Sequence, residues 1–231
     1  MLSKKVDLPI VIEARNVEKI YKSSSVTVHA LKGVDISISK GEMVAIMGPS
    51  GCGKTTLLNC LSGLDSIDNG DITIQGNKLQ DLSDDKLSEF RASNMGFVFQ
   101  LYNLLPVLTS VENVELPLLV SGFSAKQARK KSEEKLDDVG LLEWKNHLPG
   151  ELSGGQRQRV TLARSLVNEP AIVWADEPTG NLDSTNEIEI IDLLSDLNKK
   201  NQQTFVIVTH SDYVGGRTNR IIKMKDGLIE E

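Results

Sequence analysis

The segment GPSGCGKT, residues Gly48 to Thr55, constrains the fold more than any other part of this sequence. It matches the pattern G-x-x-x-x-G-K-[ST], in which a glycine-rich loop between a strand and a helix surrounds phosphates with backbone N–H groups. The flanks agree with this context, because Met43 to Met47 is an apolar run and Leu57 and Leu61 follow at helical spacing. The segment therefore predicts an α/β fold with a nucleotide-binding loop.

Two acidic residues follow another apolar run of the chain. Ala171 to Ala175 predicts a buried strand, and Asp176 and Glu177 come directly after it. Beside a phosphate loop, Lys54 bridges the β and γ phosphates, and the Thr55 hydroxyl and Asp176 hold Mg²⁺. Glu177 is then placed to polarise the attacking water. Two adjacent acids are also common on solvated turns, so this prediction depends on the phosphate loop.

The composition excludes several classes of protein. Among 231 residues, Lys and Arg number 26 and Asp and Glu 32, giving a net charge of −6, which argues against a nucleic-acid-binding face. Cys52 and Cys60 are too few for a disulfide framework or a structural zinc site. The first ten residues lack the apolar run of a secretory signal, and no stretch approaches the roughly 18 apolar residues of a membrane span. We expect a soluble, cytoplasmic protein that meets membranes only through a partner.

The remaining pattern alternates short apolar runs with helical segments, as α/β proteins do. Buried strands are predicted at 97–99, 172–175 and 205–209, and alternating, half-exposed strands at 10–13, 35–39 and 71–75. Asp226-Gly227 predicts a tight hairpin. Capping boxes predict helices that begin after Ser124 and Ser184. The stretch from Gln100 to Ser153 contains no strong strand, so we predict a mostly helical subdomain inserted into the core.

Three further residues are candidates for the site, and two of them, His210 and Tyr21, also have an ordinary structural interpretation. His210 follows the strand at 205–209, where it can hydrogen-bond a γ-phosphate, although a histidine at a strand end is usually structural. Gln100 follows the strand at 97–99 and can contact Mg²⁺ or water. Tyr21 is either an adenine-stacking platform or a half-buried loop tyrosine.

The segment LSGGQ, residues 152–156, predicts a second helix end that reads an anion. Ser153 can cap the helix, Gly154 and Gly155 leave the backbone N–H groups accessible, and the helix dipole favours negative charge. One chain therefore contains two phosphate-reading helix ends.

Taken together, these motifs resemble the nucleotide-binding subunit of ATP-binding cassette (ABC) transporters, over essentially the whole chain. The resemblance implies a Mg²⁺-dependent ATPase of one domain, with a core at about 1–100 and 165–231, an antiparallel β subdomain, and a helical subdomain at 101–164. It implies that two such chains pack head to tail, so that the signature of each, the LSGGQ segment, closes over the ATP of the other. It also implies that Asp183 lies in a loop that crosses the interface. The implied ATP-binding residues are Tyr21, Gly48, Ser50, Gly51, Cys52, Gly53, Lys54, Thr55 and Thr56; the trans contacts are Ser153, Gly154, Gly155 and Gln156; the catalytic residues are Glu177, His210 and Gln100; and the metal ligands are Thr55, Gln100 and Asp176.

A finer resemblance links residues 100–117 and 177–183 to macrolide exporters, lipoprotein-release systems and peptide-resistance transporters. It implies an integral-membrane permease partner, a second ATPase subunit that is either a copy or a similar chain, and a position at the inner face of the cell membrane. The apolar, Pro-containing segment after Gln100 suits a groove for a short helix of that partner, or else it forms ordinary subdomain core. An ATP-driven module that transmits force or a signal without transport remains the alternative. A soluble relative acting on DNA or ribosomes would have a coiled-coil insertion or tandem cassettes, and this chain has neither.

Overall fold

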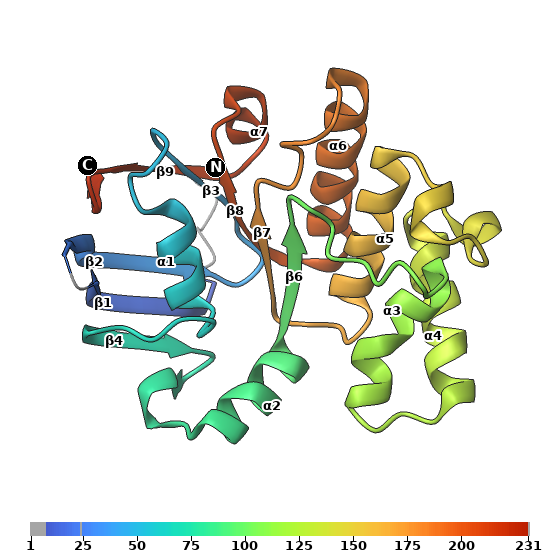
Figure 1. Cartoon of the computed structure of the whole chain (residues 1–231), viewed down its shortest axis with the longest axis horizontal. Coiled ribbons are helices and arrows are strands. Elements are labelled where there is room, and N and C mark those ends of the chain that lie inside the picture. Colours follow the sequence, from blue (N-terminus) through green and yellow to red (C-terminus); the bar gives the residue numbers. More distant parts are fainter. Residues whose placement is uncertain (1–7, 24, 231) are drawn as a thin grey trace, which may run out of the picture.

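The computed structural model describes residues 8–23 and 25–230, which form two sheets and a set of helices (Figure 1). The first sheet has the strand order β2-β1-β4-β5 and is antiparallel. The second has the order β10-β9-β3-β8-β7-β6 and is parallel except for the pairing of β9 with β10. The strands are β1 (Ile10–Lys22), β2 (Thr27–Ser39), β3 (Met43–Met47), β4 (Asn69–Ile74), β5 (Asn77–Lys78), β6 (Met95–Phe99), β7 (Ile172–Asp176), β8 (Thr204–Thr209), β9 (Arg220–Lys225) and β10 (Leu228–Glu230).

The helices divide between the two faces of the second sheet. One face packs on α1 and the first sheet, and the other on α5 and α6, so alternate residues of β3, β7 and β8 enter two separate hydrophobic cores. The helices are α1 (Lys54–Leu61), α2 (Asp84–Asn94), α3 (Ser110–Val120), α4 (Ala125–Asp138), α5 (Gly154–Leu166), α6 (Ser184–Asn201) and α7 (Asp212–Gly216), with 3₁₀ turns at Leu79–Asp81, Leu142–Trp144 and Pro149–Glu151.

The helical pair α3–α4 and the four-stranded sheet lie at opposite ends of the molecule, with the six-stranded sheet between them (Figure 1). The α/β prediction, the four buried strands and the absence of strands between Gln100 and Ser153 are confirmed. The division into a core and a subdomain at 101–164 stays a proposal; α5 itself continues to Leu166. Within the described residues, no helix is long and apolar enough to cross a membrane.

Two local predictions differ from the structure. The cap of α6 is Asp183, one residue before the predicted Ser184, because the Asp183 carboxylate accepts a hydrogen bond from the Asn186 N–H. The strands predicted at 10–13 and 35–39 are parts of the 13-residue strands β1 and β2. Their alternation breaks at a bulge around Asn16, where φ is 47° and the pairing register shifts.

The predicted helix after Ser124 and the hairpin at Asp226-Gly227 are present. Ser124 caps α4 with a full capping box, and Asp226 and Gly227 both have positive φ between β9 and β10. Cys52 and Cys60 are free and buried, and burial raises the pKa of Cys60 to about 12.

Candidate nucleotide-binding and catalytic site

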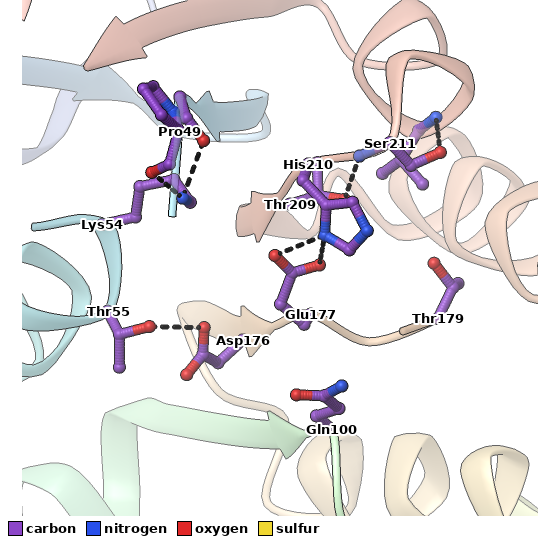
Figure 2. Close-up of polar contacts among 12 residues, drawn as sticks. Pro49, Lys54, Thr55, Gln100, Asp176, Glu177, Thr179, Thr209, His210 and Ser211 are labelled. Carbon is purple, nitrogen blue, oxygen red and sulfur yellow. Dashed lines mark hydrogen bonds and ion pairs between the residues drawn. The ribbon is translucent and has the colours of Figure 1, made fainter. Parts of the chain in front are cut away.

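The phosphate loop connects β3 to α1, as the motif predicts. Lys54 is the first residue of α1, and its Nζ donates to the carbonyl oxygens of Gly48 and Pro49 at 2.8 and 2.9 Å, which closes the loop on itself (Figure 2). The N–H groups of the first turn have no intrahelical partner and are available to an anion.

Two glycines of the loop are required by packing as well as by phosphate approach. A Cβ on Gly48 would meet the Met224 carbonyl of β9 and lie 2.9 Å from the Cys52 Sγ. A Cβ on Gly53, whose φ is 105°, would lie 2.6 Å from the Ala30 carbonyl of β2. The loop is therefore held tightly between two strands from other parts of the chain.

A cavity of about 630 Å³ opens in front of this loop. Its size is in the range of small-molecule sites. Tyr21 of β1 lies in its wall and is 42% exposed. Seven predicted residues of the loop and α1 also line it: Ser50, Gly51, Cys52, Gly53, Lys54, Thr55 and Thr56. Gly48 does not, because it is packed against β9.

Asp176, the last residue of β7, and Glu177, which follows it, face this loop. The Thr55 hydroxyl donates a hydrogen bond to the Asp176 carboxylate at 3.1 Å (Figure 2). This contact brings together two oxygen atoms of the kind that Mg²⁺ prefers as ligands. Burial raises the pKa of Asp176; the Thr55 hydrogen bond and the Lys54 charge oppose this, and the nearby Glu177 adds to it. The residues present fit a divalent cation held between the loop and β7.

Glu177 and His210 meet at the edge of the six-stranded sheet. Asp176 pairs with Val208 in the parallel register of β7 and β8, so the residues that follow these strands lie close together. The Nδ1 of His210 is 2.9 and 3.0 Å from the two carboxylate oxygens of Glu177 (Figure 2). The Glu177 side chain is only 18% exposed and also lines the cavity. The imidazole, whose side chain is 72% exposed, thus contacts the carboxylate directly, a contact that the sequence did not indicate.

The backbone of Glu177 is in the left-handed region, with φ at 47°. Its N–H donates to the Val208 carbonyl at 2.9 Å, which holds this conformation. Such geometry costs about 1–3 kcal/mol and persists where the surroundings impose it, often at functional sites. Here it turns the chain directly after the strand, so that the Asp176 side chain contacts Thr55 and the Glu177 side chain contacts His210.

Gln100 follows β6 on the other side of β7, since Phe99 pairs with Asp176. Its side-chain nitrogen donates to Asn181 Oδ1 at 3.4 Å, and Asn181 donates back to the Gln100 carbonyl at 2.9 Å. Gln100 is not part of the cavity wall among the described residues. The structure thus ties it to the loop that precedes α6, and no local sequence pattern indicates this contact.

The LSGGQ segment begins α5 as predicted. The Ser153 Oγ accepts from the Gln156 N–H at 3.2 Å, and the Gln156 side chain accepts from the Ser153 N–H at 2.8 Å. The structure adds a reason for glycine at Gly155, because a Cβ there would overlap the side-chain amide of Asn186 on α6. Residues 153–156 do not line the cavity at the phosphate loop.

Asp183 lies between these features, as the cap of α6. Its two carboxylate oxygens accept from the backbone N–H and the side-chain nitrogen of Asn186, both at 2.8 Å, and these bonds lower the pKa of Asp183. Asn186 therefore touches both Asp183 and the signature helix. Sequence reasoning did not single out Asn186.

Comparison with known proteins decides the family. The family profile described as "ABC transporter" matches residues 31–180, which is well over half of the chain. The chain belongs to the ABC transporter family. Its fold is that of an ABC ATPase cassette, and it is the ATP-hydrolysing subunit of a transporter.

Similar curated proteins are ATP-binding subunits of the kinds that the finer resemblance named. The lipoprotein-releasing system ATP-binding protein LolD of Porphyromonas gingivalis is 46% identical over 95% of this chain and 99% of its own length. The bacitracin export ATP-binding protein BceA of Halalkalibacterium halodurans is 44% identical, over 95% and 87%. The macrolide export ATP-binding/permease protein MacB of Bdellovibrio bacteriovorus is 45% identical over 95% of this chain and 33% of its own.

A similar solved structure is the dimeric cassette MJ0796 of Methanocaldococcus jannaschii. It has a TM-score of 0.88 and 46% identity, over 95% of this chain and 97% of that one. The same cassette was also solved as a dimer in a post-hydrolysis state bound to ADP and Pi, with a TM-score of 0.88 and 45% identity. The family resemblance, the fold and the ATPase activity are therefore confirmed for this chain.

Proposed function

We propose that this ABC ATPase works as a head-to-tail pair with a second cassette, and that Mg²⁺-dependent ATP hydrolysis in this pair powers an integral-membrane permease. One observation carries the proposal. The chain has two helix N-termini built for anions, at α1 and α5, but only the first lines the nucleotide-sized cavity. The second helix end, with Ser153, is left to read a phosphate held by another chain, as the dimeric relative suggests.

Within each site, different residues bind the nucleotide, hold the metal ion and activate water. Lys54 and the loop N–H groups bind the β and γ phosphates, and Tyr21 stacks on the adenine. Thr55, Asp176 and Gln100 would hold Mg²⁺, which would supply positive charge to the phosphates when bound. Glu177 accepts a proton from the attacking water, and His210 holds its carboxylate in place and reaches toward the γ-phosphate.

The partner surface is proposed from the groove between α2, β6 and α5. This groove has a volume of about 430 Å³, and its walls include Arg91, Phe97 and Asn103. In the segment after Gln100, Leu101 and Val107 are 75% and 80% exposed, whereas later apolar residues such as Val114 form buried core. Part of this segment is therefore buried core, and its exposed apolar part suits contact with a short apolar helix of a permease.

Transport is the proposed output, because the similar curated subunits are named for release or export. The chain would then lie at the cytoplasmic face of the membrane through the permease, with no nucleic-acid partner.

The head-to-tail model is tested by mixing two inactive variants. Lys54→Ala removes the cation on the phosphates, and Ser153→Arg places bulk and positive charge at an anion-binding helix end. If the signature acts in trans, a mixed dimer contains one site with both defects and one site with neither, so ATPase activity should recover on mixing. Ser153→Arg alone should still bind ATP as a monomer but fail to dimerise with it.

A matched control separates the signature from simple loss of a helix cap. Ser124 caps α4 through the same kind of capping box, so Ser124→Arg breaks an equivalent cap on another helix. This variant should keep its ATPase activity. Two results would place both helix ends around one nucleotide and refute the model. One is an ATPase activity of the mixture that never exceeds that of either variant alone, and the other is a Ser153→Arg monomer that cannot bind ATP.

A further inference from the structure

A partly buried ion pair between Lys19 and Asp65 lies next to Tyr21. The Tyr21 hydroxyl donates to Asp65 Oδ2 at 2.7 Å, although Tyr21 belongs to β1 and Asp65 follows the end of α1. The ring is 42% exposed and lines the nucleotide cavity, so one end of this side chain is fixed and one face is open.

Asp65 is itself held from several directions. Its Oδ1 accepts from Lys19 Nζ at 2.7 Å and from the Ser66 N–H at 2.8 Å. The Lys19 side chain is 8% exposed, and its Nζ also donates to the Ser66 carbonyl at 2.7 Å. Partial burial works against the charge of Asp65, but the hydrogen bonds from Lys19 and Tyr21 outweigh it and lower the pKa of Asp65. The carboxylate therefore stays ionised and in one orientation.

Lys19 also constrains the ring. Its Nζ lies 5.1 Å from the centre of the Tyr21 ring, within the range of a cation–π contact. The ring is thus bounded by Lys19, and its hydroxyl is bonded to Asp65. A tyrosine with free χ angles would have to be ordered each time a base stacked on it, at a cost to affinity.

We propose that Asp65, held by Lys19, is a positioning residue that fixes the Tyr21 ring at the mouth of the cavity for stacking on the nucleotide base. The proposal rests on the proposed role of Tyr21 as the base platform. Asp65 does not touch the nucleotide. Its contribution is the order that it imposes on Tyr21, so its effect should depend on the base and should be absent for a ligand without one.

The experiment measures equilibrium binding of ATP and of tripolyphosphate, which has no base, to the full-length chain. Asp65→Ala and Tyr21→Phe should each weaken ATP binding by about 2- to 12-fold, the loss expected for one side chain that must be ordered on binding. Neither change should alter the affinity for tripolyphosphate. In steady-state assays of these two variants, KM for ATP should rise, while kcat at saturating ATP should stay the same.

A double-mutant cycle distinguishes positioning from a general structural role. Because both substitutions remove the same hydrogen bond, the double variant should lose no more ATP affinity than either single variant. Asp71→Ala is the matched control, since it removes an ion pair of similar length, Lys78 to Asp71 at 2.6 Å, from the same sheet. It should change neither affinity.

Several results would overturn the proposal. These are unchanged ATP affinity in Asp65→Ala or Tyr21→Phe, equal losses for ATP and tripolyphosphate, or additive losses in the double variant. If Asp65→Ala does not fold, Tyr21→Phe still decides, because it leaves the Lys19–Asp65 pair intact. Tyr21→Ala separates the role of Tyr21 as the base platform from the positioning role of Asp65. If Tyr21→Ala weakens ATP binding while Tyr21→Phe does not, the platform role stands and the positioning role fails. If Tyr21→Ala has no effect on ATP binding, the platform role fails too.

Discussion

Gly155→Ala should destabilise the chain through one contact between α5 and α6. An added Cβ would overlap Asn186 Oδ1 and lie 2.9 Å from its Cγ, closer than real side chains pack. The Asn186 side chain cannot turn away without losing the 2.8 Å hydrogen bond that its amide nitrogen donates to Asp183 Oδ2. Overpacking of this kind costs about 1–3 kcal/mol. For a chain of this length that corresponds to a fall in Tm of about 2–12 °C.

Gly154→Ala is the matched control for this change. Its Cβ would meet only the far ends of two flexible side chains, at 3.2 Å from the Tyr102 hydroxyl and 3.4 Å from Leu182 Cδ2. Alanine is favoured over glycine in a helix by up to about 1 kcal/mol, and both variants gain this. The difference in Tm between the two variants, measured by thermal unfolding, therefore reports the overlap alone.

Asn186→Ala should rescue Gly155→Ala. It removes the overlapping amide and leaves its own Cβ 3.5 Å away, at an ordinary contact distance. The two substitutions together should then cost less than the sum of their separate effects. Equal Tm values for Gly155→Ala and Gly154→Ala, or strictly additive losses with Asn186→Ala, would refute the packing explanation.

Two further predictions concern charge. Glu177→Gln should bind ATP but lose about 10²–10⁴-fold in turnover, because it removes the carboxylate that accepts a proton from water and keeps the size of the side chain; an ATP-dependent dimer on size-exclusion chromatography checks binding, and near-normal turnover would contradict the role. The second uses Asp65, whose pKa is lowered in the folded state below the ordinary value of about 3.9. Its stabilising effect should be complete above that value and lost as pH falls through the folded pKa, so the Tm difference between wild type and Asp65→Asn should shrink in acid. A difference that stays constant from neutral pH down to about pH 3 would show that the Asp65 charge contributes nothing.

The sequence could predict the site where a motif coincided with the end of a buried strand. Asp176, His210 and Gln100 each follow an apolar run, and parallel strands bring such residues to one edge of a sheet. In the structure the three strands β6, β7 and β8 are neighbours, so Gln100, Asp176 and His210 do lie at the same edge of the sheet. This shared position could be predicted because strand ends and motif residues are both local features of the sequence.

Contacts between distant segments had no such signal. Asn186 packs on Gly155, Asn181 binds Gln100, and Asp65 binds Tyr21, at sequence separations of 31, 81 and 44 residues. Each involves a common polar residue on an ordinary turn or helix end. The cap of α6 shows the same limit on a small scale: Asp183 and Ser184 are both good caps, and the register of the helix start decided between them.

The phosphate loop shows how one pattern can have two physical causes. The motif predicts glycine where phosphates approach, yet Gly48 also faces the carbonyl of Met224 on β9. The hairpin that β9 forms with β10 is bonded to the same loop, since the Gly227 N–H donates to the Cys52 carbonyl at 3.0 Å. The Gly227 carbonyl in turn accepts from the Lys32 N–H of β2 at 3.0 Å. The hairpin predicted from Asp226-Gly227 is thus a brace between the first sheet and the nucleotide loop, and a bulkier residue at Gly48 would disturb the loop before any nucleotide arrived.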